Sequence, residues 1–246
     1  LFFNLSRNME LREYKRLANA LKLQDSNKYS TWDNIMQLCL NMYEDSHDYL
    51  KYCLKLSKAV KKSAQRLLVQ NQDVRCEDLY WQALKFEAPH LFDSYLLYLE
   101  RKRLDQDRFY SPKRKQLNKY GLIQALQDLE DDKLDILSIS MPPGTQKTTL
   151  EKFFCSWIIG KHPDDFSLFF SHSGDITRMF YDGVLDITTN SDEYCWAEIF
   201  PDVKFHSTNA KRETINFNKY KPFSNIQCTS VGSKNAGKVR ANRYLY

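Results

Sequence analysis

One stretch in the second half of the chain constrains the fold more than any other. It runs from an apolar segment, Leu134–Ser140, through a turn rich in proline and glycine, Met141–Gln146, into a helical pattern that opens on Lys147 and Thr148. A short apolar run, a Pro/Gly turn and an amphipathic pattern predict a strand, a loop and a helix in that order. Such a loop can hold a polyphosphate, because its backbone N–H groups and the helix N-terminus point at the anion.

The first two helical residues carry the side chains that a phosphate loop requires. In such loops a lysine reaches the β- and γ-phosphates and the next hydroxyl ligates Mg²⁺. Lys147 and Thr148 are therefore the predicted catalytic pair, and Thr148 is the predicted magnesium ligand. The predicted nucleotide-binding residues are Pro143, Gly144, Thr145, Gln146, Lys147, Thr148 and Thr149.

The stretch departs from G-x-x-x-x-G-K-[ST], because Met141 and Gln146 stand where the two glycines belong. Glycine before the lysine tolerates positive φ and lets the backbone approach phosphate, so weaker nucleotide binding is expected. The alternative is an ordinary strand-to-helix turn with a lysine in the first helical turn. A second segment, 232–238, matches the glycine and lysine spacing better, but the next residue, Val239, offers no hydroxyl for a metal.

Composition limits the class of protein without naming it. A hydrophobic fraction of 42% and an aromatic fraction of 14% predict a folded chain. The net charge of +5 permits a polyanionic partner and does not require one. The six cysteines form no C-x-x-C pair, which favours reduced thiols in a cytosolic setting. No apolar run approaches the roughly 18 residues of a membrane helix, so no membrane partner is expected.

A polar break at Gln70–Asp73 predicts two domains, a helical region over 1–72 and an α/β domain over 73–246. Helical spacing covers 9–21, 32–42 and a third segment from Tyr49 that ends in a basic run. That run could contact DNA or RNA, and a solvated helix face is the alternative. Its residues are Lys58, Lys61, Lys62 and Arg66.

The rest of the chain alternates helical and strand patterns, which predicts a mostly parallel sheet with helices on both faces and an antiparallel edge. This is the fold class of P-loop NTPases. Helices are expected over 78–86, 89–103, 115–130 and after Ser173, and strands over 167–171, 203–205, 214–217, 226–231 and 244–246. The strand over 134–140 is expected beside the segment 243–246.

The segment Asp107–Arg114 combines aromatic rings with guanidinium groups. A purine base could stack there on Arg108, Phe109 or Tyr110. A packed entry into the domain is the alternative explanation for the same residues.

An ordered set of segments resembles the ATPase half of the large terminase subunit of tailed bacteriophages, over about residues 73 to 246. Each segment alone is unspecific, and the order carries the resemblance. The segments are 108–117 (RFYSPKRKQL), 125–132 (ALQDLEDD), 134–149, 198–201 (EIFP), 228–232 (CTSVG) and 236–246 (AGKVRANRYLY).

The resemblance implies a motor that hydrolyses ATP, with Mg²⁺, to pump double-stranded DNA into a capsid. The implied partners are DNA, the portal protein, the small terminase subunit and other copies of the chain in a ring, in the cytoplasm of an infected bacterium. It implies that Arg108, Phe109, Tyr110 and Arg114 belong to the adenine-side motif. It also places the Walker B acids and a nuclease half beyond Tyr246, so that residues 1–246 alone are expected to hydrolyse little or no ATP.

The basic residues near Tyr246 allow two interpretations. Lys238, Arg240 and Arg243 could reach a neighbouring subunit's γ-phosphate as arginine fingers do, and surface solubility is the alternative.

The second functional hypothesis is a non-catalytic module that binds DNA, portal or an adaptor and carries a degenerate phosphate loop. A small-molecule kinase is a third class, but it requires a lid and an acceptor site that the sequence does not reveal.

Overall fold

The computed structural model describes residues 49–71, 74–219, 221–231 and 241–246. The chain divides into two compact units, Leu1–Glu87 and Ala88–Tyr246, which are described separately. This division falls later than the expected boundary between residues 72 and 73. The helices expected over 9–21 and 32–42 lie outside the described residues.

In the first unit, helices α3 (Tyr49–Asn71) and α4 (Val74–Glu87) pack against each other. Apolar side chains from both helices form the contact, and the hydroxyl of Ser57 donates to the carbonyl of Ala83 at 3.1 Å. Lys61 of α3 forms an ion pair with the buried carboxylate of Glu87. The buried apolar residues are Cys53, Leu56, Val60 and Ala64 on α3, with Leu79, Ala83 and Leu84 on α4.

Helix α8 (Lys147–Lys161) is the centre of the second unit. Its Trp157 ring lies 5.1 Å from Phe92 of α5 (Phe92–Leu99), and its Phe154 ring lies 5.5 Å from Tyr244 near the chain end. The other helices in the described part of this unit are α6 (Tyr110–Lys119), α7 (Leu122–Glu130), α9 (Gly174–Thr189), α10 (Trp196–Ile199) and a 3-10 turn at Asp105–Asp107. Because apolar side chains surround α8 on several sides, its position is fixed by the core.

The sheet of the second unit is mixed. Its strands are β1 (Ser167–Ser171), β2 (Phe205–Asn209), β3 (Thr214–Phe217), β4 (Ile226–Ser230) and β5 (Tyr244–Leu245), in the order β2-β3-β4-β1-β5. β1 is parallel to β4 and β5, whereas β3 is antiparallel to β2 and β4. The expected α/β class is confirmed, and the parallel arrangement holds for β1, β4 and β5.

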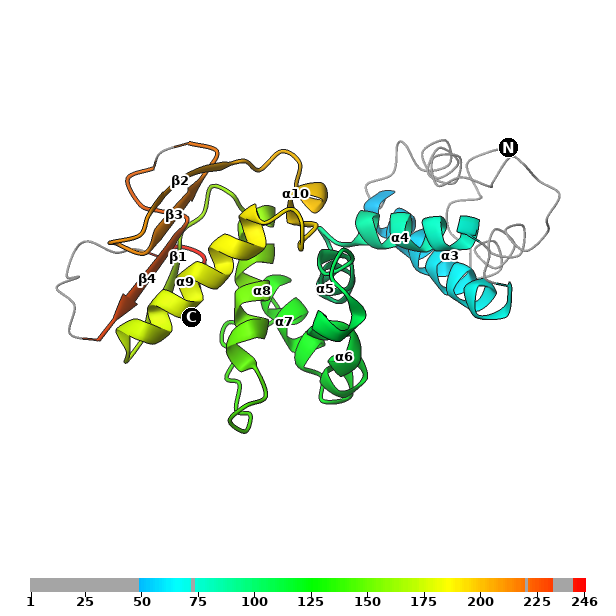
Figure 1. Cartoon of the computed structure of the whole chain (residues 1–246), viewed down its shortest axis with the longest axis horizontal. Helices are drawn as coiled ribbons and strands as arrows, with labels where there is room; N and C mark the ends of the chain where they lie inside the picture. The colour runs from blue at the N-terminus through cyan, green and yellow to red at the C-terminus, as the bar shows by residue number, and fades with distance from the viewer. Residues whose placement is uncertain (1–48, 72–73, 220, 232–240) are drawn as a thin grey trace. The chain divides into compact units, whose positions relative to one another are not determined.

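Helix α9 covers one face of this sheet. Its Phe180 ring stacks on Phe169 of β1 with centroids 3.8 Å apart, and α9 also packs on β4. Figure 1 shows α9 and α8 between the sheet and the helices α5, α6 and α7. On the opposite face, Phe170 is 47% exposed and Leu245 is 71% exposed. Within the described ranges, helices therefore cover the α9 face, and the opposite face is open at Phe170 and Leu245. The expectation of helices on both faces is met for one face only.

The prediction of a strand over Leu134–Ser140 is wrong. The segment has no regular secondary structure, and Ile136 is 85% exposed. Strand β5, which was expected to lie beside it, is the edge strand of the sheet and pairs with β1. The segment has an apolar composition suited to a strand, but such a run becomes a strand only when a neighbouring backbone supplies the ladder.

Candidate phosphate-binding turn

The turn Met141–Gln146 joins the irregular segment to the N-terminus of α8. Two of its residues have left-handed backbone conformations, Gly144 with φ of 78° and Gln146 with φ of 63°. The hydroxyl of Thr145 donates to the carbonyl of Pro142 at 2.7 Å, which fixes the turn internally. The left-handed Gln146 occupies the position before the lysine, where the sequence comparison with a phosphate loop expected glycine.

Lys147 lies at the first position of α8 and bends back over this turn. Its ammonium donates to the carbonyl of Met141 at 2.7 Å. The helix ladder begins later, because the N–H groups of Thr149 and Leu150 donate to the carbonyl of Gln146. A basic side chain and the start of a helix therefore face the same turn.

Several donors at this helix start are available to a ligand. Among the described residues, the backbone N–H groups of Lys147 and Thr148 and the hydroxyl of Thr148 have no hydrogen-bond partner. N–H groups at a helix N-terminus favour anions, and a hydroxyl that follows the lysine can ligate Mg²⁺. A polyphosphate with Mg²⁺ fits this set of donors.

A cavity of about 680 Å³ lies beside Lys147. The irregular segment forms one part of its wall, and residues 242–246 form another. Glu151, one turn after Lys147 on α8, also lines it. Burial raises the pKa of the Glu151 carboxyl, and the charge of Lys147 acts in the opposite direction. Glu151 is a polar wall residue that the sequence analysis missed, although its i+4 position relative to Lys147 was visible in the sequence.

A second cavity, of about 630 Å³, lies between the turn and helices α6 and α7. Its wall includes Gly144 and Thr145 from the turn, with Gln116 and Tyr120 from α6 and its C-terminal end. Lys113 of α6 donates to the side-chain carbonyl of Gln146, and its ammonium lies 4.5 Å from the Phe109 ring centroid. The fold therefore brings the predicted adenine-side segment next to the predicted phosphate turn through Lys113, which was not among the predicted residues.

The four predicted adenine-side residues have partners inside the protein. Arg108 donates to three carbonyls after α5, of Glu100, Arg101 and Arg103, and pairs with Asp105 at 2.6 Å. Arg114 pairs with Asp93 at 2.7 Å, and the hydroxyl of the buried Tyr110 also donates to Asp93. Phe109 is 8% exposed and packs on Phe153 at 5.6 Å. Their stacking role stays a prediction.

The basic residues near the chain end are only partly described. Lys238 and Arg240 lie outside the described residues. Arg243 donates to the carboxylate of Glu130 at 3.2 Å, in a cluster that also contains Lys161, His162 and Tyr244. Its guanidinium is therefore engaged inside the unit.

No protein-family model, curated protein or solved structure matches the chain. In the described ranges no group of three or more His, Cys, Asp or Glu side chains is placed to hold a metal ion. The described helices include none that is both long and apolar enough to cross a membrane.

Proposed function

We propose that the unit Ala88–Tyr246 binds the polyphosphate of ATP at the turn Met141–Gln146 and the N-terminus of α8. The observation that carries this proposal is the convergence of the Lys147 ammonium and the unpaired N–H groups of the α8 N-terminus on one turn. The α8 N-terminus and the Lys147 ammonium would hold the phosphates, and the Thr148 hydroxyl would hold Mg²⁺. Bound Mg²⁺ supplies charge neutralisation of the phosphates.

The cavities beside the turn extend the proposal to the rest of the nucleotide. The 630 Å³ cavity adjoins Gly144 and Thr145, and its wall includes the 72% exposed Tyr120 ring. A ring at the entrance of a mostly apolar pocket can stack on a base. Base binding between α6 and the turn is therefore the proposed arrangement, with Lys113 near the phosphates.

The wider role follows from the resemblance to large terminase subunits. We propose that the intact protein couples ATP hydrolysis to translocation of double-stranded DNA. Its proposed partners are the portal protein, the small terminase subunit and further copies of the chain in a ring, in the cytoplasm of an infected bacterium. Helix α8 packs on α5, on α9 and on Tyr244 of β5, so a shift of its phosphate-binding end would be transmitted to these elements.

The proposal is tested by titrating the full chain with a fluorescent ATP analogue and Mg²⁺. Lys147→Ala should abolish saturable binding, and Lys119→Ala, an exposed lysine of α6, should leave it unchanged. Equal binding by wild type and Lys147→Ala would contradict the proposal. Circular dichroism of each variant separates loss of binding from loss of fold.

A second candidate is the non-catalytic interaction module, and a specific observation favours it. The Lys147 ammonium is already bound by the Met141 carbonyl, and the segment before the turn is not in the sheet. A relic loop would keep this closed arrangement with nucleotide present. Absence of ATP binding in both wild type and Gln146→Gly would support the module.

A further inference from the structure

Helix α3 has an unusual charge distribution. Its 23 residues include six basic side chains and no acidic one, whereas α4 has the acidic residues Glu77, Asp78 and Glu87. Opposite charges are usually interspersed on a solvated helix. Among the described residues of the first unit, α3 therefore carries six of the eight basic side chains, and α4 carries all three acidic ones.

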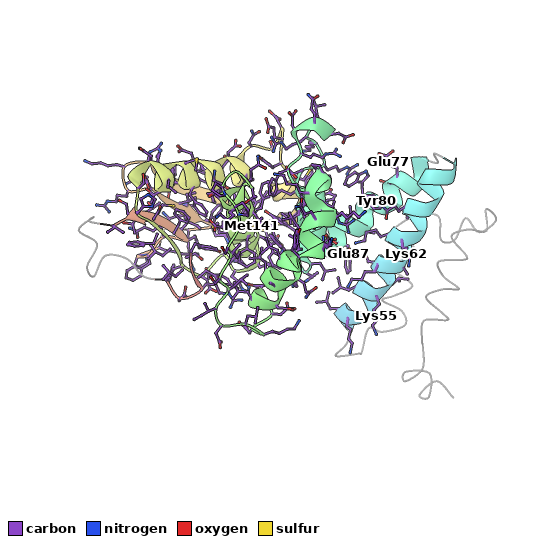
Figure 2. The ribbon with its side chains drawn as sticks, turned by 90° about the horizontal axis from the view of Figure 1, so that it is seen from below. Lys55, Lys62, Glu77, Tyr80, Glu87 and Met141 are labelled. Atoms are coloured by element: carbon purple, nitrogen blue, oxygen red, sulfur yellow. The ribbon has the colours of Figure 1, made fainter. Side chains whose placement is uncertain are left out.

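Four of these basic residues form a lysine stripe, defined as Lys51, Lys55, Lys58 and Lys62. Their spacings of four, three and four residues place them on one side of the helix, over about 16 Å of its length. All four are exposed, and Figure 2 labels Lys55 and Lys62 on α3. Among the described residues, Lys58 and Lys62 form no ion pair. The fifth lysine, Lys61, lies outside the stripe, is half-buried and pairs with Glu87.

We propose that the lysine stripe binds the phosphate backbone of double-stranded DNA. A duplex presents one negative charge per roughly 1.7 Å of axis, so a stripe of about 16 Å faces more phosphates than it has ammonium groups. Lysine contacts phosphate as a flexible point charge and needs no fixed geometry. The expected binding is independent of base sequence.

The structure favours this partner over two others. An interfacial helix needs a free apolar face to enter a membrane. The apolar face of α3, with Leu56 and Val60, is buried in the contact with α4. Single-stranded nucleic acid is held by aromatic side chains on which bases stack, but the positions of the stripe carry lysine alone. A duplex needs neither feature.

The inference deepens the proposed translocation of double-stranded DNA by placing a DNA contact in the unit Leu1–Glu87, whereas the ATP-binding turn belongs to the other unit. The two proposals therefore fail separately. Lys147→Ala should leave duplex binding unchanged, and loss of the stripe should leave ATP-analogue binding unchanged.

The test measures fluorescence anisotropy of a labelled duplex of about 30 base pairs with the full chain, over a salt series. If all four lysines contact phosphate, the plot of log affinity against log salt has a slope of about −3.6, and the double variant Lys58→Gln/Lys62→Gln lowers its magnitude by about two. The matched control, Lys85→Gln/Lys119→Gln, removes the same charge from exposed positions outside the stripe.

Weaker duplex binding and a smaller salt slope in the stripe variant, with an unchanged control, would support the proposal. Equal losses in both double variants would overturn it, as would unchanged binding in the stripe variant or no binding by wild type. Two competitors complete the test. A single strand of the same length that binds as tightly as the duplex, or anionic vesicles that displace it, would assign the stripe to a different partner.

Discussion

The ammonium of Lys147 donates to the carbonyl oxygen of Met141 at 2.7 Å, so the first residue of α8 closes the turn onto its own start. A ligand phosphate would compete with one neutral carbonyl for this ammonium. Charged acceptors form stronger hydrogen bonds than neutral ones, so a bound phosphate can displace the Met141 carbonyl without moving the helix. The hydrogen bond between Lys147 and Met141 is thus compatible with phosphate binding in which only the Lys147 side chain moves.

Gln146→Gly should stabilise the second unit. Gln146 has φ of 63°, and a left-handed conformation costs a non-glycine residue about 1–2 kcal/mol. Glycine removes that cost but adds backbone entropy to the unfolded chain. The expected net gain is about 0.5–1 kcal/mol, measured as the free energy of unfolding in urea. Gln146→Ala is the control, because it loses the side chain and keeps the strain. If the glycine variant is no more stable than the alanine variant, strain at residue 146 is not the cause.

Glu151→Gln should tighten ATP-analogue binding at pH 7.5 and flatten its pH dependence. Burial raises the pKa of Glu151, and its ionised form repels phosphate and competes for Lys147. Wild-type affinity should therefore fall as pH rises through this raised pKa. Removing the charge should tighten binding about fivefold at pH 7.5, an order-of-magnitude Coulomb estimate. Because the nucleotide itself titrates, the informative quantity is the ratio of the two affinities at each pH. If the ratio of the two affinities is constant from pH 5 to 8, the charge of Glu151 does not weaken nucleotide binding.

Sequence patterns located the elements whose signals are local. Strand β1 occupies Ser167–Ser171 and β3 occupies Thr214–Phe217, both as predicted. The Ser173 hydroxyl accepts from the N–H of Asp175 and caps α9, which is also a local contact. The helix expected over 115–130 is instead α6 and α7, because Gly121 has φ of 71° and ends α6. A glycine inside a helical pattern indicates a possible helix end, and Gly121 is such a residue.

The candidate site depends more on long-range contacts. Arg108 and Tyr110 looked available for base stacking, but the carbonyls after α5 and the Asp93 carboxylate engage them. These hydrogen bonds could not be predicted from the neighbouring residues in the sequence, because the partners come from a preceding helix and loop. Lys147 needs only its own turn, so its placement was predictable. In contrast to Lys147, the strand expected over Leu134–Ser140 depends on a partner elsewhere in the chain, and no strand forms there.

Glu130→Gln should destabilise the second unit by about 3 kcal/mol at pH 7, because it breaks a buried ionic cluster. Burial alone would raise the pKa of Glu130, but hydrogen bonds from His162 and Tyr244 and the charge of Lys161 lower it. A lowered folded pKa contributes stability that is present above the unfolded value of about 4.3 and is lost as pH falls through the folded pKa.

The measurement for Glu130 is urea denaturation of both proteins at pH 7 and across the acid range. The gap between wild type and Glu130→Gln should narrow as the pH falls below about 4.3. Asp128→Asn is the control, because Asp128 pairs with Lys133 on the surface and should change stability much less. A gap that stays constant in acid would show that packing, rather than charge, explains the loss.

Gly160→Ala should destabilise the second unit although alanine is the better helix former. A methyl group at residue 160 would lie 2.3 Å from the Phe200 ring. That ring cannot shift freely, because it packs on Tyr95 and Trp196 with centroids 6.2 Å and 5.5 Å away. Overpacking costs about 1–3 kcal/mol, and the gain in helix propensity is about 1 kcal/mol. Because the 2.3 Å contact is severe, the overpacking cost should lie in the upper part of that range, and the expected net loss in the free energy of unfolding is about 1–2 kcal/mol.

Two further variants separate close packing from a general effect of alanine. At Gly174, the first residue of α9, nothing lies within 4 Å of an added methyl group, so Gly174→Ala should be neutral or slightly stabilising. Phe200→Leu should relieve the clash, so the double variant with Gly160→Ala should lose less than the two single losses added together. Additive losses would mean that the Phe200 ring does not fix the position of α8. In that case the anchoring of the helix that carries Lys147 would rest on its contacts with α5, α9 and β5.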